Sequence, residues 1–108
     1  MRRSLLMAVF VLLAAACGSP PLSPDASGEE VYAGRCAGCH GDDLEGGGGF
    51  TNPRGPSLGP GSQSADRSDA YYVQTITRGQ GRMPPVRGLT DAQIERVIAY
   101  IRSVQSGG

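Results

Sequence analysis

"GRCAGCHGDD", residues 34–43, decides the fold, because it sets Cys36 and Cys39 three positions apart and puts His40 directly after the second thiol. The 108-residue chain contains three cysteines in all and no other histidine. Two thiols and an imidazole at this spacing suit three kinds of site: a redox-active dithiol, a zinc site, or the covalent attachment of haem. The rest of the sequence helps to separate these possibilities.

The surroundings of the motif favour haem. A thioredoxin-like dithiol belongs in a βαβ unit, and no strand pattern precedes this one. Structural zinc requires four nitrogen or sulfur ligands, and the only further cysteine is Cys17, far away along the chain. CxxCH is the attachment signature of c-type haem. We therefore predict one haem c, bonded through thioethers of Cys36 and Cys39 to its two vinyl groups, with His40 as an iron ligand.

The sixth position of such an iron has one candidate ligand. The chain has no second histidine and no lysine, and two of its three methionines, Met1 and Met7, lie in the N-terminal apolar segment. Met83 remains, in the sequence GRMPPV, where glycine, arginine and two prolines argue against a core helix. His40 and Met83 together would form the ligand pair typical of electron-transfer haems, because thioether sulfur raises the reduction potential.

The N-terminus predicts export. Two arginines precede an apolar run over residues 5–16, which is too short to cross a bilayer comfortably, so residues 1–16 are predicted to be a signal peptide. The AAAC sequence that ends at Cys17 resembles a bacterial lipobox, which implies lipid attachment at Cys17. Residues 17–27 read as a flexible linker and residues 28–108 as the folded domain. The predicted location is the periplasmic side of a bacterial membrane, lipid-anchored, with a soluble periplasmic protein as the alternative.

Charge and size narrow the class of protein further. Residues 17–108 carry eight arginines against ten carboxylates, a formal charge of −2, which gives no electrostatic support for binding nucleic acid or an anionic membrane surface. A chain this short, with seventeen glycines and eight prolines, can build only a small hydrophobic core. Such domains usually need a disulfide, a metal or another bound group for stability.

A capping box predicts where the first helix begins. Glu30 follows Ser27 by three residues, so we expect a helix from Gly28 through the cysteine motif. Residues 41–66 are so rich in glycine and proline that neither helix nor strand is expected there. A loop of this length without secondary structure is unusual in a compact domain, unless it wraps around a bound group.

Two further helices are predicted after this loop. Ser68 can cap a helix over residues 69–78, which Gly79 would end. Thr90 and Gln93 form a second capping box, and the helix after them has apolar residues at i, i+3, i+4 and i+7, namely Ile94, Val97, Ile98 and Ile101. No segment alternates with period two, so we predict an all-α fold without a substantial sheet.

Over residues 27–104 the chain resembles the small class I bacterial cytochromes c. Gly28 and Tyr32 stand eight and four residues before the first thiol, as do the glycine and the aromatic residue of that family's first helix. The tripeptide that starts at Met83 is similar to the family's distal-ligand loop, and VIAYIRS, residues 97–103, to its last helix. The resemblance implies three to four short helices around one covalent haem, with the N- and C-terminal helices crossing and a long Gly/Pro-rich loop.

The resemblance also assigns roles in the loop. GPSL, residues 55–58, is similar to the segment whose proline carbonyl accepts the hydrogen bond of the haem-ligating imidazole. This similarity implies that role for Pro56 and a haem contact for Leu58. One departure from the family, the glycine-rich insertion over residues 45–50, lies just before this segment.

The crossing of the two helices implies contacts of Val97 and Tyr100 with Gly28 and Tyr32. The absence of lysine is the second departure from the family, and it means that a lysine-ringed docking face is not expected here.

Together these features predict a monomeric, monohaem electron carrier that is not an enzyme. Its partners would be redox proteins that donate and accept single electrons, and a membrane reached through the lipid on Cys17. One alternative is the electron-entry subunit of a larger oxidoreductase complex. Another is a gas-binding or peroxidatic haem protein in which Met83 leaves the iron, although the chain offers no distal histidine as acid or base.

Overall fold

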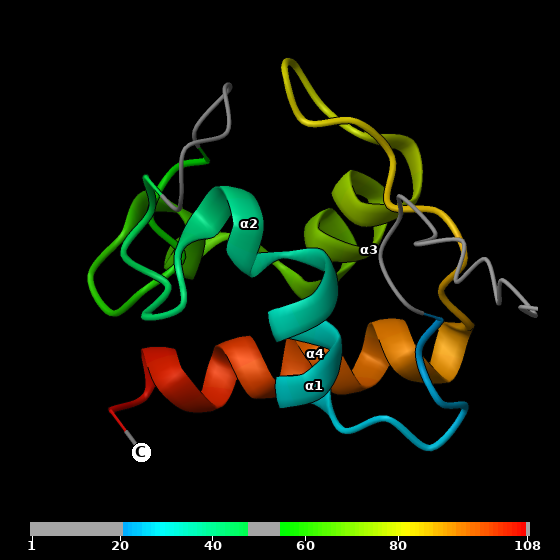
Figure 1. Cartoon of the computed structure of the whole chain (residues 1–108). Helices are drawn as coiled ribbons and strands as arrows, with labels where there is room; N and C mark the ends of the chain where they lie inside the picture. The colour runs from blue at the N-terminus through cyan, green and yellow to red at the C-terminus, as the bar shows by residue number, and fades with distance from the viewer. Residues whose placement is uncertain (1–20, 48–54, 108) are drawn as a thin grey trace, which may run out of the picture.

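The computed structural model describes residues 21–47 and 55–107, and its regular structure is helical (Figure 1). Its elements in chain order are α1 (Gly28–Arg35), α2 (Ala37–His40), the 3-10 turn η1 (Gln63–Asp66), α3 (Asp69–Arg78) and α4 (Asp91–Gln105). Within these ranges the only β pairing is an isolated bridge between Gln80 and Met83. The predicted all-α fold is confirmed.

Two predicted features lie outside the described residues: the signal peptide over residues 1–16 and the lipid attachment at Cys17. Among the helices that the structure does describe, none combines the length and the apolar character needed to cross a bilayer.

The helices begin where the capping residues predict. The Ser27 hydroxyl accepts a hydrogen bond from the Glu30 amide at 3.1 Å, and the Glu30 carboxylate accepts one from the Ser27 amide at 2.8 Å. Thr90 and Gln93 form the same reciprocal pair at the start of α4, and Ser68 caps α3. These bonds satisfy amides that have no partner inside the helix. The predicted bounds of α3 are confirmed.

The main core lies where α1 crosses α4 (Figure 1). Val31 of α1 and Val97 of α4 are completely buried, and the rings of Tyr32 and Tyr100 lie with centroids 5.6 Å apart. Gly28 allows the close approach, because a Cβ on it would lie 2.1 Å from the Arg96 carbonyl oxygen. The predicted contact between the first and last helices is therefore confirmed.

Replacing Gly28 by alanine is expected to lower the free energy of unfolding by about 2 kcal/mol or more, within the range of overpacking effects. The added methyl would meet the Arg96 carbonyl, which is backbone and cannot swing aside. Gly34→Ala in the same helix is the matched control. Its Cβ meets only a terminal carbon of Leu22, at 3.4 Å, so this variant should be neutral or slightly more stable. Equal losses for both variants in denaturant unfolding would contradict the close helix crossing.

The segment before α1 differs from the prediction. Residues 21–26, which we call the strap, were expected to belong to a flexible linker, but they are bound to α4. The Gln93 amide donates to the Ser23 carbonyl at 3.1 Å, and the Arg96 guanidinium donates to the carbonyls of Pro24 and Ala26 at 2.8 and 3.0 Å. Ala26 is buried. The flexible linker prediction is wrong for this part, and the folded body begins before Gly28.

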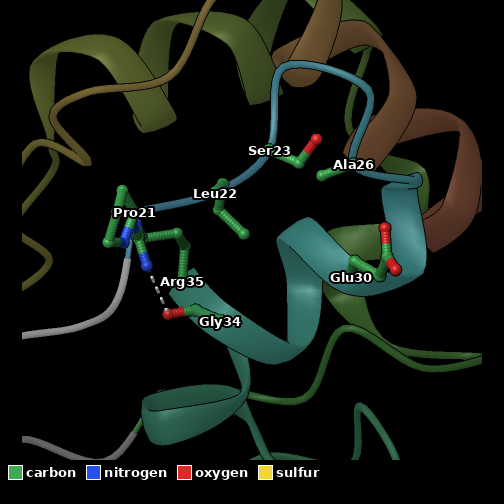
Figure 2. Close-up of a pocket in the computed structure, with 7 residues that line it drawn as sticks. All are labelled: Pro21, Leu22, Ser23, Ala26, Glu30, Gly34 and Arg35. Carbon is green, nitrogen blue, oxygen red and sulfur yellow. Dashed lines mark hydrogen bonds between the residues drawn. The ribbon is translucent and has the colours of Figure 1, made fainter.

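The strap also packs along α1 (Figure 2). The Leu22 side chain is directed toward the helix and is partly buried against the core. A shallow cavity of about 270 Å³ lies between the strap and the face of α1 that carries Glu30 and Gly34. The strap is therefore part of the domain surface on this side.

The long loop contains little regular structure, as predicted, with one short addition. Among its described residues, only η1 is helical, and the Ser62 hydroxyl caps it by accepting from the Ala65 amide. Leu44, almost fully buried, adopts φ +65°, a conformation that non-glycine residues rarely take. Its carbonyl accepts a 2.7 Å hydrogen bond from the Leu58 amide, which ties the two sides of the loop together.

Candidate cofactor site

The cysteine motif forms a single helical turn. α1 ends at Arg35, and the next residue, Cys36, caps it with an amide that donates to the Tyr32 carbonyl at 2.9 Å. α2 begins directly after Cys36. The amides of Cys39 and His40 both donate to the Cys36 carbonyl, at 3.2 and 3.0 Å. Both thiols are free and half-buried. Residues three or four apart on a helical turn share a face, so the two thiols and the imidazole belong to one compact group.

A buried tyrosine holds the exit of this turn. The Tyr32 hydroxyl donates to the carbonyl of Gly41, the residue after His40, at 2.7 Å. Burial, with smaller contributions from neighbouring groups that include Cys36, raises the pKa of Tyr32 well above its ordinary value. The phenol therefore stays protonated and keeps its donor role at any physiological pH.

The His40 ring is oriented by one hydrogen bond. The imidazole is buried, and its Nδ1 lies 2.8 Å from the Pro56 carbonyl oxygen. A carbonyl only accepts, so Nδ1 carries the proton and, in the neutral ring, Nε2 keeps its lone pair. This is the arrangement of a metal-ligating histidine, whose second nitrogen donates to a backbone carbonyl. The surroundings of His40 thus suit an imidazole that binds iron through Nε2.

Gly55 completes the cradle of the imidazole, and sequence reasoning missed it. A Cβ on Gly55 would lie 2.6 Å from His40 Nδ1 and 2.9 Å from the Cys39 carbonyl oxygen. The Gly55 amide also donates to that Cys39 carbonyl at 2.7 Å. The only available signal was a glycine directly before Pro56, which is common in loops of every kind.

Gly55→Ala is expected to displace the imidazole or the Pro56 carbonyl and so break their hydrogen bond. The loss of stability should be about 1–3 kcal/mol, as for other overpacked sites, accompanied by a lower yield of haem-bearing protein. Gly59→Ala in the same segment is the control, because its Cβ would approach within 3 Å only the flexible end of Glu45. Unfolding of the two variants in denaturant measures the difference, and indistinguishable stabilities would contradict the cradle.

Met83 comes from a different element. It ends a tight hairpin between α3 and α4, in which Gln80 and Met83 exchange two backbone hydrogen bonds of 2.9 Å. Gly79 is required at its base, because a Cβ there would lie 2.6 Å from the Met83 carbonyl oxygen. The amide of Val86 donates to the Ile76 carbonyl of α3 at 2.8 Å, which fixes the chain after the hairpin.

The hairpin and the cysteine turn stand on the same side of α4. Figure 1 shows α2 and the yellow hairpin that contains Met83 both above the orange and red helix. The structure thus places four of the predicted site residues next to one another: Cys36, Cys39, His40 and Pro56. Met83 belongs to the separate hairpin.

The other two kinds of site considered for the cysteine pair, a redox-active dithiol and a zinc site, have less support from the structure. Burial raises the pKa of the Cys36 thiol to about 11, with Arg35 opposing the shift and Cys39 adding to it. Redox-active dithiols depend on a lowered thiol pKa, so the raised pKa of Cys36 does not suit that use. Across residues 21–47 and 55–107, no group of three or more His, Cys, Asp or Glu side chains could hold a metal ion. A neutral thiol is compatible with the addition of S–H across a haem vinyl group.

The sequence matches a family model and is similar to the sequences of known proteins. A family model described as "Cytochrome C oxidase, cbb3-type, subunit III" matches residues 23–101. Cytochrome c-551 of Bacillus subtilis is 35% identical over 111 residues, which cover 89% of each chain. Cytochrome c6 of a Picosynechococcus species is 36% identical over 115 residues, 94% of this chain and 92% of the relative.

Solved structures agree on the fold. Cytochrome cL from Hyphomicrobium denitrificans superposes with a TM-score of 0.59 at 33% identity, over 72% of this chain and 45% of that one. The KustC0563 c-type cytochrome gives the same TM-score at 22% identity, over 74% of this chain and 99% of that one, and at this identity the likeness concerns the fold alone.

Proposed function

Because the chain belongs to the c-type cytochromes, in the family described as cytochrome c oxidase, cbb3-type, subunit III, we propose that it carries single electrons on a haem iron held by His40 and Met83. Membership implies one covalently bound haem c, and the cysteine pair of the CxxCH turn, Cys36 and Cys39, bonds it. When bound, this group supplies a one-electron ferric/ferrous couple. The observation that carries the assignment of His40 as a ligand is the 2.8 Å contact between its Nδ1 and the Pro56 carbonyl.

The residues of the chain have distinct tasks in this proposal. Cys36 and Cys39 hold the cofactor, and His40 offers the lone pair on Nε2 while Pro56 keeps the proton on Nδ1. Met83 offers a thioether from a short hairpin whose two hydrogen bonds limit its movement. Leu58, partly buried against the core, would add an apolar contact. Ligands that stay in place in both oxidation states keep the reorganisation on electron transfer small.

The test is the visible spectrum and carbon monoxide binding of the purified, exported protein. A carrier with both axial positions filled should show a sulfur–iron signature when oxidised and should not bind carbon monoxide at neutral pH when reduced. Rapid stoichiometric uptake of carbon monoxide would overturn the ligand assignment in favour of a gas-binding protein. An intact mass without one added haem would overturn the cofactor assignment as well.

A second candidate is the electron-entry subunit of a membrane oxidase, which the description of the matching family model favours. The same ligand set would serve both roles. Co-purification from membranes separates them, because a subunit would remain with its complex at fixed stoichiometry whereas a free carrier would not.

We also propose export to the periplasmic side, cleavage after residue 16 and a lipid on Cys17, as the N-terminal sequence indicates. The bound strap then makes the tether short. Pro21 is only four positions after Cys17, so the reach is about 14 Å at ~3.5 Å per residue. The domain would therefore stay close to the membrane surface. The intact mass of the mature protein also tests this proposal, because the lipid adds to it.

A further inference from the structure

Gln105, in the last turn of α4, joins three parts of the molecule through its amide. Nε2 donates to the Leu58 carbonyl and to the Tyr72 hydroxyl, both at 2.9 Å. Oε1 accepts from the Arg102 guanidinium, also at 2.9 Å. The side chain thus connects α4, α3 and the long loop at one point.

The neighbours of Gln105 fix the direction in which its amide points. Arg102 lies over the Tyr72 ring, 4.5 Å from its centroid, and also binds Asp69 at 2.9 Å and the Ala65 carbonyl at 3.0 Å. A guanidinium only donates, so it holds Oε1 and turns the amide NH₂ toward the loop. The Tyr72 hydroxyl uses its own proton on the Ser64 carbonyl, at 2.7 Å, and is left as an acceptor. Each group of the network therefore has one consistent role.

The target of this amide, Leu58, lies two residues beyond Pro56. The Leu58 amide donates to the Leu44 carbonyl at 2.7 Å, and its carbonyl accepts from Gln105, so its backbone is held on both sides. At the other end of the segment, the Gly55 amide donates to the Cys39 carbonyl. The Pro56 carbonyl that faces His40 therefore lies between two residues with fixed backbone, Gly55 and Leu58. The position of Leu58 depends in part on Gln105.

We propose that Gln105 is a positioning residue for the His40–Pro56 hydrogen bond, and that it thereby holds down the reduction potential of the haem. This inference rests on the proposed ligation by His40. A strong hydrogen bond from Nδ1 makes the imidazole a more basic ligand and favours ferric iron. Loosening the Pro56 segment weakens that bond, so loss of the Gln105 amide should raise the potential.

The test compares Gln105→Met with Gln74→Met in the holoprotein. Methionine keeps the length of the side chain and removes the donors and the acceptor, and Gln74 is exposed on α3. We expect Q105M to keep its covalent haem, to raise the midpoint potential, and to speed solvent exchange of the His40 Nδ1 proton, followed by NMR, about tenfold, equivalent to losing one hydrogen bond. Q74M should leave both quantities unchanged.

A lower melting temperature of Q105M with unchanged potential and unchanged proton exchange would overturn the inference, because the residue would then be only structural. If the Q105M protein does not accumulate, the midpoint potential of a second variant, Tyr72→Phe, tests the inference instead. This substitution removes one acceptor of the same amide and should raise the potential less, and no change would overturn the inference. A wild-type protein without a histidine-ligated haem spectrum would instead overturn the proposed function, so the two failures are distinguishable.

Discussion

A chain in which both Cys36 and Cys39 are replaced by alanine is expected to lose covalent haem and, with it, the cooperative fold. The described core contains eleven buried apolar residues, and a core of this kind in a small domain rarely supplies more than about 3–5 kcal/mol. Between α2 and α3, and between α3 and α4, the described chain contains little regular structure. Binding of a group to the folded state alone adds directly to folding stability, so its loss removes that term entirely.

Three measurements check this expectation. The intact mass should fall by one haem, the visible absorbance should vanish, and the far-ultraviolet circular dichroism should show no cooperative melting transition. Cys17→Ala is the matched control, because it removes the only other thiol outside the motif and should keep the haem and the transition. A coloured C36A/C39A protein with haem still covalently attached would contradict the assignment of the thioethers.

The helix ends were predictable because their signals are local. Ser27 and Glu30, or Thr90 and Gln93, are three residues apart, so the capping bonds depend only on side chains that are visible side by side in the sequence. The glycine after α3 acts equally locally. Helix ends of this kind can therefore be predicted without knowing the tertiary structure.

The strap was mispredicted because its partners are distant in the chain. Proline and serine at residues 19–24 are typical of a flexible linker, yet Gln93 and Arg96, about 70 residues later, bind three of the strap's carbonyls. Gln93 had already been assigned a role in the capping box, and it serves both with the two ends of one amide. Nothing in a linear pattern indicates this second use.

The candidate site likewise contains residues that could be predicted from the sequence and residues that could not. Residue types and counts alone were enough to single out Cys36, Cys39, His40 and Met83, because the chain offers almost no other soft or imidazole ligands. The supports around them were not predictable from pattern. Gly55 matters through a contact across 15 residues, and the Gln105 amide reaches Leu58 across 47. Pro56 was indicated only by family resemblance.

Met83→Leu is expected to change the iron without disturbing the fold. Leucine has nearly the volume of methionine and should keep the half-buried packing of the hairpin, whose shape depends on backbone bonds between Gln80 and residue 83. It removes the only methionine of residues 17–108 and with it the sulfur proposed to bind the iron. Axial ligands set haem potentials over a range of about 0.8 V, so losing the sulfur should lower the midpoint potential by a sizeable part of that range.

The same variant should bind carbon monoxide when reduced at neutral pH, whereas the wild type should not. Arg82→Ala, one residue earlier on the hairpin and exposed, is the control and should retain the wild-type spectrum and potential. Because leucine is expected to keep the hairpin and removes the thioether, a shift seen in M83L and not in R82A is attributed to loss of the sulfur. Identical spectra and potentials for M83L and the wild type would show that Met83 is not an iron ligand, and the electron-carrier assignment would then need another sixth ligand from a chain that has no second histidine and no lysine.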